Sequence, residues 1–191
     1  MNKEIEFTIE IEKLKNIFRR TKHIYDNKYE NDAEHSWHIA VMAMIFKDYV
    51  DFEIDELKVI KMLLVHDLVE IYAGDTYCYD TEGYKTKEKR ELNAAKKLFS
   101  ILPEGKSKIF FDLWREFEDM KTNDSLYANS LDRLCPMIIN LYGDGGSWNE
   151  NIVRREMVEK RGEVLTNISE KFKNILTEIL DEAESRGYFH E

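Results

Sequence analysis

The chain has 191 residues, a net charge of −10 at pH 7 and 35% charged residues. This length suits one domain and is sufficient to bury a core, so we expect a single domain over residues 1–191. The acidic balance argues against a nucleic-acid partner, because broad nucleic-acid binding requires a basic surface. A small anionic ligand stays compatible, since it needs only one or two local cations.

The composition favours an all-α fold, with two prolines, eight glycines and many helix-forming residues. No apolar stretch is long enough to cross a membrane, and the first residues lack the apolar region of a signal peptide. Cys78 and Cys135 lack metal-finger spacing and are expected to be reduced thiols. We therefore expect a cytoplasmic protein without a membrane partner.

Apolar periodicity and capping signals predict seven helices. Asn31 and Glu34 form a potential capping box, and Pro103 should end a helix. The predicted helices cover residues 7–23, 32–50, 56–73, 86–102, 106–120, 125–142 and 149–186. Residues 74–84 should form a loop, and the glycines at 143–146 should break the chain before a long C-terminal helix.

The doublet His66–Asp67 lies inside the apolar run 59–72. Aspartate is rarely buried without a partner that neutralises it. Glu70 lies one helical turn after His66, on the same face. Two interpretations remain open from this run alone: a core histidine capped by an internal carboxylate, or a bound cation.

Two further segments favour the cation. His35 lies in the first turn of the helix that begins near Asp32, and Asp132 lies in an apolar helical stretch. Together with His66 and Asp67, they supply two imidazoles and two carboxylates from three helices. This mixture suits a first-row divalent ion or zinc, and about 30–140 would form the core around it.

The pattern resembles the HD-domain metal-dependent phosphohydrolases, and in particular the branch with bacterial 5′-deoxynucleotidases. The motifs are AEHS at 33–36, HDLVEIYAGD at 66–75 and LDRL at 131–134, and the resemblance spans about residues 10–180. It implies a compact all-α HD-domain bundle, a homodimer, and hydrolysis of (deoxy)nucleoside 5′-monophosphates to nucleoside and phosphate. It also implies one divalent metal ion, whether Mn, Co, Fe, Zn or Mg, held by His35, His66, Asp67 and Asp132.

Such a metal would lower the pKa of its bound water and bind a phosphoryl oxygen. Glu70 would then orient that water or take its proton. By resemblance Asp75 is catalytic too, either moving a proton towards the leaving 5′ oxygen or holding the sugar.

The phosphate also needs a cationic side chain. Arg19 matches the family's phosphate-binding arginine in the first helix, and Lys85 and Lys87 are further candidates, or else solvated surface charges. Arg20 stands where the best-known 5′-deoxynucleotidases carry a tryptophan that crowds the sugar's 2′ position. Selectivity for deoxyribose over ribose is therefore left open by the sequence.

The remaining expectations concern nearby side chains and rival functions. His38 should pack in the core or support the metal ligands, and Tyr77, Tyr79 and Tyr84 could contact a base. The alternatives are a hydrolase of nucleoside triphosphates or guanosine tetraphosphate, and a nucleotide-binding module without turnover. The presence of Glu70 and Asp75 argues against the module, since a binder has no need of acids that activate water.

Overall fold

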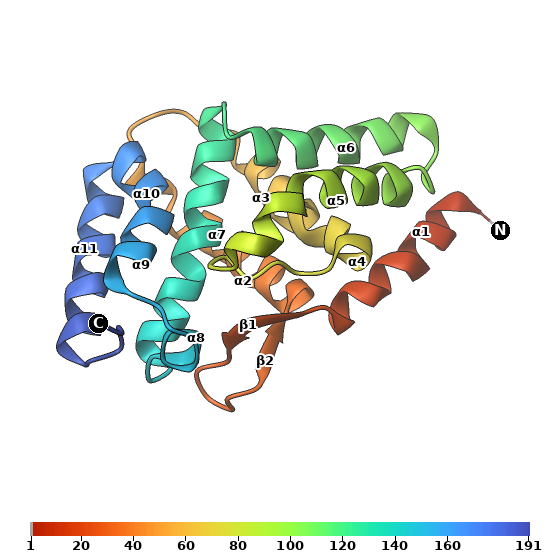
Figure 1. The fold of residues 1–191 in the computed structure, drawn as a ribbon. Coiled ribbons are helices and arrows are strands. Elements are labelled where there is room, and N and C mark those ends of the chain that lie inside the picture. Colours follow the sequence, from red (N-terminus) through yellow and green to blue (C-terminus); the bar gives the residue numbers. More distant parts are fainter. Residues whose placement is uncertain (1) are drawn as a thin grey trace.

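The computed structural model describes residues 2–191 as packed helices with one two-stranded sheet, so the predicted all-α class is confirmed (Figure 1). The first half contains α1 (Lys3–Ile11), η1 (Glu12–Asn16), β1 (Phe18–Lys22), β2 (Tyr29–Asn31), α2 (Asp32–Ile45), η2 (Lys47–Tyr49), α3 (Glu56–Val65), η3 (His66–Val69) and α4 (Glu70–Ala73), where η marks a 3-10 helix. The second half contains α5 (Thr81–Phe99), α6 (Glu104–Asp119), α7 (Asn123–Tyr142), α8 (Gly146–Glu150), α9 (Arg155–Arg161), α10 (Glu163–Ile168) and α11 (Glu170–Ser185). Within residues 2–191, no helix has both the length and the apolar character needed to span a bilayer. The expected single domain stays a prediction.

The N-terminal segment differs from its prediction. The helix expected over 7–23 ends at Ile11, and Arg19 lies on strand β1 rather than in the first helix. Strand β1 pairs antiparallel with β2, with Phe18 opposite Asn31 and Lys22 opposite Tyr29. Pairing with a later segment decides this structure, and local helical periodicity cannot detect it.

Helices α2, α3 and α7 form the centre of the molecule. Helix α2 begins with the predicted capping box, in which Asn31 and Glu34 exchange hydrogen bonds between side chain and backbone. The inner faces are apolar and fully buried, as at Ile39, Met62 and Leu131. Burial of this kind stabilises a fold by about 1.5–3 kcal/mol for each large aliphatic side chain.

The helix expected over 56–73 changes its winding at the His–Asp doublet. Residues His66–Val69 form a 3-10 turn between α3 and α4, so Glu70 follows His66 through a tighter turn than an α-helix gives. Gly74 then adopts φ of 75°, which only glycine takes without strain, and ends α4. This reversal returns Asp75 to the region of the doublet.

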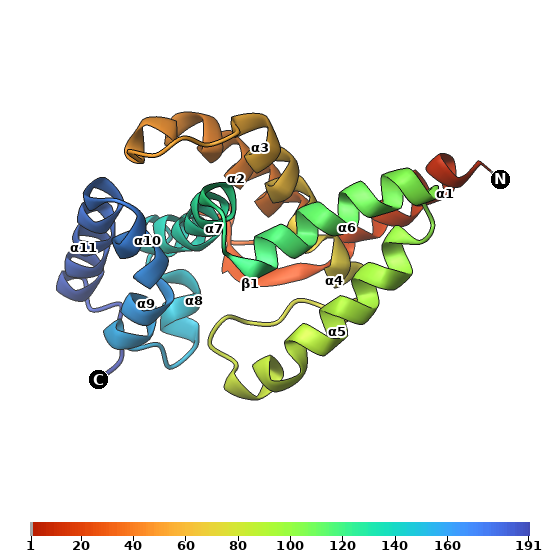
Figure 2. The ribbon, with the colours of Figure 1, turned by 90° about the horizontal axis from the view of Figure 1, so that it is seen from above.

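Two hydrophobic cores meet at this 3-10 turn. One core contains Met62 and Leu63 from α3 and the inner faces of α2, α7, α10 and α11. The other contains Leu68 and Val69 and packs them against α1, α5 and α6. Figure 2 shows α10 and α11 at one end of the molecule and α1 and α5 at the other. The polar side chains of the doublet therefore lie where the two cores meet.

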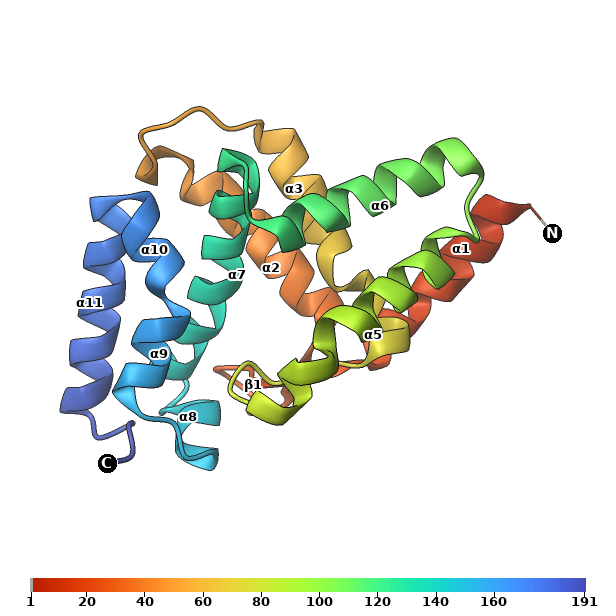
Figure 3. The same ribbon diagram turned by 45° about the horizontal axis from the view of Figure 1, so that its top comes forward.

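The prediction of one long helix over 149–186 is wrong. The segment instead contains α8, α9, α10 and α11, and Figure 3 shows α9, α10 and α11 packed alongside α7. A Cβ at Gly162 would lie 2.7 Å from Leu176 Cδ2, so a larger residue here would have to displace the Leu176 side chain of α11. Ser169 accepts a hydrogen bond from the backbone N–H of Phe172 and caps α11.

Candidate active site

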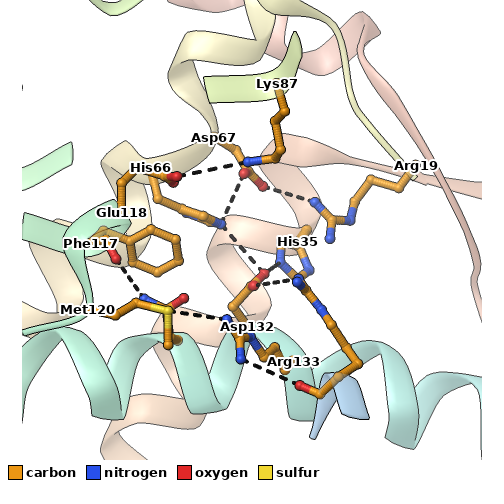
Figure 4. A network of polar contacts seen from close by, with 12 residues as sticks. Arg19, His35, His66, Asp67, Lys87, Phe117, Glu118, Met120, Asp132 and Arg133 are labelled. Carbon is orange, nitrogen blue, oxygen red and sulfur yellow. Dashed lines mark hydrogen bonds and ion pairs between the residues drawn. The ribbon is translucent and has the colours of Figure 1, made fainter. Parts of the chain in front are cut away.

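Three buried side chains from separate elements meet at the centre of the molecule. His35 on α2, His66 on η3 and Asp132 on α7 each offer one ligand atom, and these atoms lie within 4.8 Å of one another. His35 Nε2 is 3.0 Å and His66 Nε2 is 3.7 Å from Asp132 Oδ1 (Figure 4). We call this group the histidine–aspartate cluster.

The imidazole of His66 is oriented for a ligand. Its Nδ1 donates a hydrogen bond to the carbonyl of Leu63 at 2.8 Å, which leaves Nε2 facing the cluster. His66 Nε2 is buried and has no hydrogen-bond partner among the described residues. The ring of Phe117 lies 4.6 Å from the His66 ring and restricts its rotation. A buried, unpartnered and fixed nitrogen beside a carboxylate fits a divalent metal ion.

Asp67 joins the cluster to Arg19. Its Oδ1 is 3.1 Å from His66 Nε2, while Oδ2 accepts a hydrogen bond from Arg19 Nη1 at 2.9 Å. Arg19 also lies 3.4 Å from Asp32 and 3.6 Å from Glu30. The structure thus brings together His35, His66, Asp67, Asp132 and Arg19, and their roles as metal ligands and phosphate-binding residue stay predictions.

A second acidic group lies beside the first. Asp32, Glu70 and Asp75 place one oxygen each within 4.8 Å of the others, and we call them the carboxylate cluster. Asp32 Oδ2 and Glu70 Oε2 are buried without hydrogen-bond partners among the described residues. Both residues proposed as catalytic, Glu70 and Asp75, therefore lie in one group.

Burial and mutual repulsion raise the pKa values of this carboxylate cluster. Burial, followed by the charges of Asp67 and Asp32, raises the pKa of Glu70 well above its ordinary value. The same two causes, burial and the charge of Asp67, raise the pKa of Asp32 to about 7. Carboxylates of this kind hold or exchange a proton near neutral pH, as acid–base catalysis requires.

The histidine–aspartate cluster shows the opposite electrostatics. Burial opposes the charge of the His66 imidazole, but Asp67 and Asp132 outweigh it and raise its pKa to about 9. Burial likewise disfavours ionised Asp132, yet the hydrogen bond from His35 and the neighbouring His66 imidazole hold its pKa well below its usual range. The metal-free cluster is therefore proton-rich, and a metal ion must displace protons to bind.

Both clusters open into a cleft of about 290 Å³. The cleft is lined by Arg19, Arg20, Lys87 and the three loop tyrosines Tyr77, Tyr79 and Tyr84, among others. Lys87 donates to Glu91 at 2.8 Å and lies 3.9 Å from Glu118, so its charge is already paired. Lys85 is exposed, pairs with Glu82 at 2.7 Å and is not part of the lining, so the structure does not bring it to the site.

His38 lies outside both clusters. It is half-buried, and its Nδ1 is 3.5 Å from Cys135 Sγ. This position agrees with the expected supporting role, which stays a prediction.

The sequence missed several side chains that line the cleft. Arg133 on α7, Glu118 on α6 and Arg161 on α9 all contribute to it. Arg161 Nη2 lies 3.5 Å from Asp132 Oδ2. A helix continuous from 149 to 186 would not bring Arg161 to Asp132. The local sequence signal for the break between α9 and α10 is Gly162.

With the geometry established, comparison with known proteins places the chain in a family. Residues 11–174 match the HD domain family, and the chain belongs to it. A solved structure described as a predicted metal-dependent phosphohydrolase from Magnetospirillum magnetotacticum MS-1 is 40% identical, with a TM-score of 0.93 over 99% of this chain and 95% of that one.

Curated relatives are similar over a shorter stretch. The 5′-deoxynucleotidase HDDC2 of Bos taurus is 33% identical over 122 residues, which cover 63% of this chain and 58% of that protein. The 5′-deoxynucleotidase HDDC2 of Dictyostelium discoideum is 36% identical over 118 residues, or 59% of this chain and 62% of that protein. The chain thus spans less than two thirds of the length of these relatives.

Proposed function

We propose that the protein is a metal-dependent phosphohydrolase that converts (deoxy)nucleoside 5′-monophosphates into nucleoside and phosphate. The observation that carries this proposal is the arrangement of three groups at one cleft. The histidine–aspartate cluster is linked to Arg19 through Asp67, and the carboxylate cluster lies beside it. The relatives support this proposal, since one is named a 5′-deoxynucleotidase and another a predicted metal-dependent phosphohydrolase.

The donor set of His35, His66, Asp67 and Asp132 fits one divalent metal ion, as the unpartnered Nε2 of His66 indicates. When bound, a metal would supply positive charge to a phosphoryl oxygen and acidify a water molecule. Asp132 holds both imidazoles in place, because its Oδ1 lies near the Nε2 atoms of His35 and His66. The identity of the metal stays open, since nitrogen–oxygen sites of this type accept several ions.

The protein's other side chains then have distinct tasks. Glu70 accepts a proton from the attacking water, because burial and the charge of Asp67 raise its pKa and make its carboxylate a stronger base. Asp75, in the same cluster, moves a proton towards the leaving 5′ oxygen or holds the sugar. Arg19 fixes the phosphate next to Asp67, and its planar fork suits two phosphate oxygens.

The cleft favours a single phosphate over longer phosphate chains. Its carboxylates outnumber its cationic side chains, and Lys87 is already paired with Glu91. A triphosphate or guanosine tetraphosphate would need further free cations at the metal. A non-catalytic binding module would not require the acids Glu70 and Asp75. A cytoplasmic location, a homodimer and the absence of a nucleic-acid partner stay predictions.

The test is phosphate release by metal-stripped protein that is resupplied with Mn²⁺ or Co²⁺, against paired deoxyribo- and ribonucleoside 5′-monophosphates. We expect release to depend on the metal, with the deoxy set preferred. Equal turnover of both sets would make the enzyme a broader nucleotidase and would implicate Arg20. No release from either set, with metal demonstrably bound, would overturn the proposal and lead to triphosphates and guanosine tetraphosphate.

A further inference from the structure

Arg161 brings a cation to the site from the C-terminal part of the chain. It ends α9, and its side chain is 29% exposed in the cleft. Nη2 lies 3.5 Å from Asp132 Oδ2, on the carboxylate whose other oxygen faces His35 and His66. Arg19 approaches through Asp67, so two guanidinium groups reach the proposed metal ligands through different carboxylates.

The surroundings of Arg161 fix its backbone and leave its side chain available. Arg133 Nη1 donates to the carbonyl of Arg161 at 3.5 Å, which anchors the end of α9 to α7. Arg161 Nη1 lies 3.4 Å from the hydroxyl of Tyr84 on α5. Within residues 2–191 these side-chain contacts, at 3.4 and 3.5 Å, are long for a group with five N–H donors.

Two other cations near the clusters, Arg19 and Lys87, are more fully engaged. Arg19 donates to Asp67 at 2.9 Å and lies close to Asp32 and Glu30, and Lys87 contacts Glu91 at 2.7 Å. Asp132, the acidic partner of Arg161, already receives both imidazoles. The charge of Arg161 is thus less compensated than the charges of Arg19 and Lys87, and it lies beside Asp132, one of the proposed metal ligands.

We propose that Arg161 binds the phosphate group of the substrate and of the phosphate product. This inference rests on the proposed function and adds a residue to its site. The guanidinium donates to phosphate oxygens that Arg19 does not reach, with Tyr84 orienting it from the opposite helix. Helix α9 is accordingly part of the substrate-binding machinery.

The test measures the affinity of metal-loaded protein for inorganic phosphate by titration calorimetry, which requires no turnover. Arg161→Gln should weaken phosphate binding by about tenfold or more, as loss of a charge-assisted hydrogen bond predicts. Metal content and affinity for the nucleoside without phosphate should stay unchanged. The matched control is Arg154→Gln, because Arg154 is exposed, pairs with Glu156 and lies outside the cleft.

A second variant covers the case in which Arg161→Gln is misfolded. Arg161→Lys keeps the charge without the fork, and it should weaken phosphate binding less than Arg161→Gln does. Unchanged phosphate affinity in a folded variant, or a wild-type protein that binds no phosphate, would overturn the inference. A parallel loss of metal would also overturn it, because Arg161 would then act by holding Asp132. A loss of nucleoside binding alone would overturn it as well. If the wild type binds phosphate but hydrolyses no monophosphate, the proposed reaction fails while the role of Arg161 stands.

Discussion

The two acidic clusters lie side by side yet respond to burial in opposite ways. In the histidine–aspartate cluster, imidazoles offset the buried carboxylate, and the pKa of Asp132 falls. In the carboxylate cluster, burial and then repulsion between like charges raise the pKa values of Glu70 and Asp32. One group is therefore built to exchange protons for a cation, and the other to keep a proton available. Burial raises the pKa of the acids in both clusters, so the different partners account for the opposite directions of the net shifts.

The largest effect should come from Asp132→Ala. This change removes the carboxylate that meets both imidazoles, so bound metal should be lost and turnover should fall by more than about 100-fold. Metal content by elemental analysis and phosphate release measure the two results. Asp112→Ala removes an exposed carboxylate on α6 and serves as the control. Full metal content in Asp132→Ala would remove Asp132 from the ligand set.

Glu70→Gln should distinguish the role of the carboxylate cluster in proton transfer from the role of the histidine–aspartate cluster in metal binding. Metal content should stay near the wild-type value, while kcat should fall by about 10²–10⁴-fold, since an amide cannot take a proton. Glu88→Gln changes a carboxylate of the same cleft outside both clusters, and it should lower kcat by less than about tenfold. A Glu70→Gln enzyme that keeps its rate would show that the catalytic assignment is wrong.

Asp32→Asn should change how the stability of the metal-free protein depends on pH. The folded-state pKa of Asp32 is raised from 3.8 to about 7, so the unfolded chain releases its proton at lower pH than the folded protein does. Wild-type stability is therefore lost between about pH 4 and pH 7, and the variant lacks this loss. Its advantage in free energy of unfolding should grow by about 1–3 kcal/mol across that window. Urea unfolding of both proteins at several pH values measures this advantage. A difference in free energy of unfolding that does not change with pH would contradict the prediction.

The smallest effect should come from Lys85→Gln, which tests how far the site extends. Lys85 is exposed and pairs with Glu82, so its loss should change KM by less than about twofold. Lys87→Gln should raise KM more than Lys85→Gln does, because it leaves the buried Glu91 without its cation. Steady-state kinetics on a nucleoside monophosphate compare the two. A larger rise in KM for Lys85→Gln would place the phosphate outside the cleft described above.

Local signals in the sequence were sufficient for the central helices and for the metal-type residues. The Asn31–Glu34 capping box fixes the start of α2, and apolar periodicity identifies α3 and α7. The unusual chemistry of His66–Asp67 in an apolar run indicated the location of the cluster before any geometry was known. These features depend on residues close together in the chain, which is why they could be predicted.

Contacts between distant segments account for what the sequence did not reveal. Arg19 lies on a strand because its partner β2 follows ten residues further on, and helical periodicity is blind to such pairing. Arg161 reaches Asp132 because the C-terminal segment bends at Gly162, which packs closely against the side chain of Leu176. A single arginine in an amphipathic stretch carries no sign of such a position.

The division of the cleft between chain segments has an evolutionary consequence. All members of both clusters lie before residue 143, whereas Ser147, Trp148 and Arg161 line the cleft from α8 and α9. Mutations in the later stretch can alter which substrates are admitted while the reaction centre is inherited unchanged. Chimeras that exchange residues 143–168 between relatives offer a direct way to transplant selectivity onto a constant catalytic core.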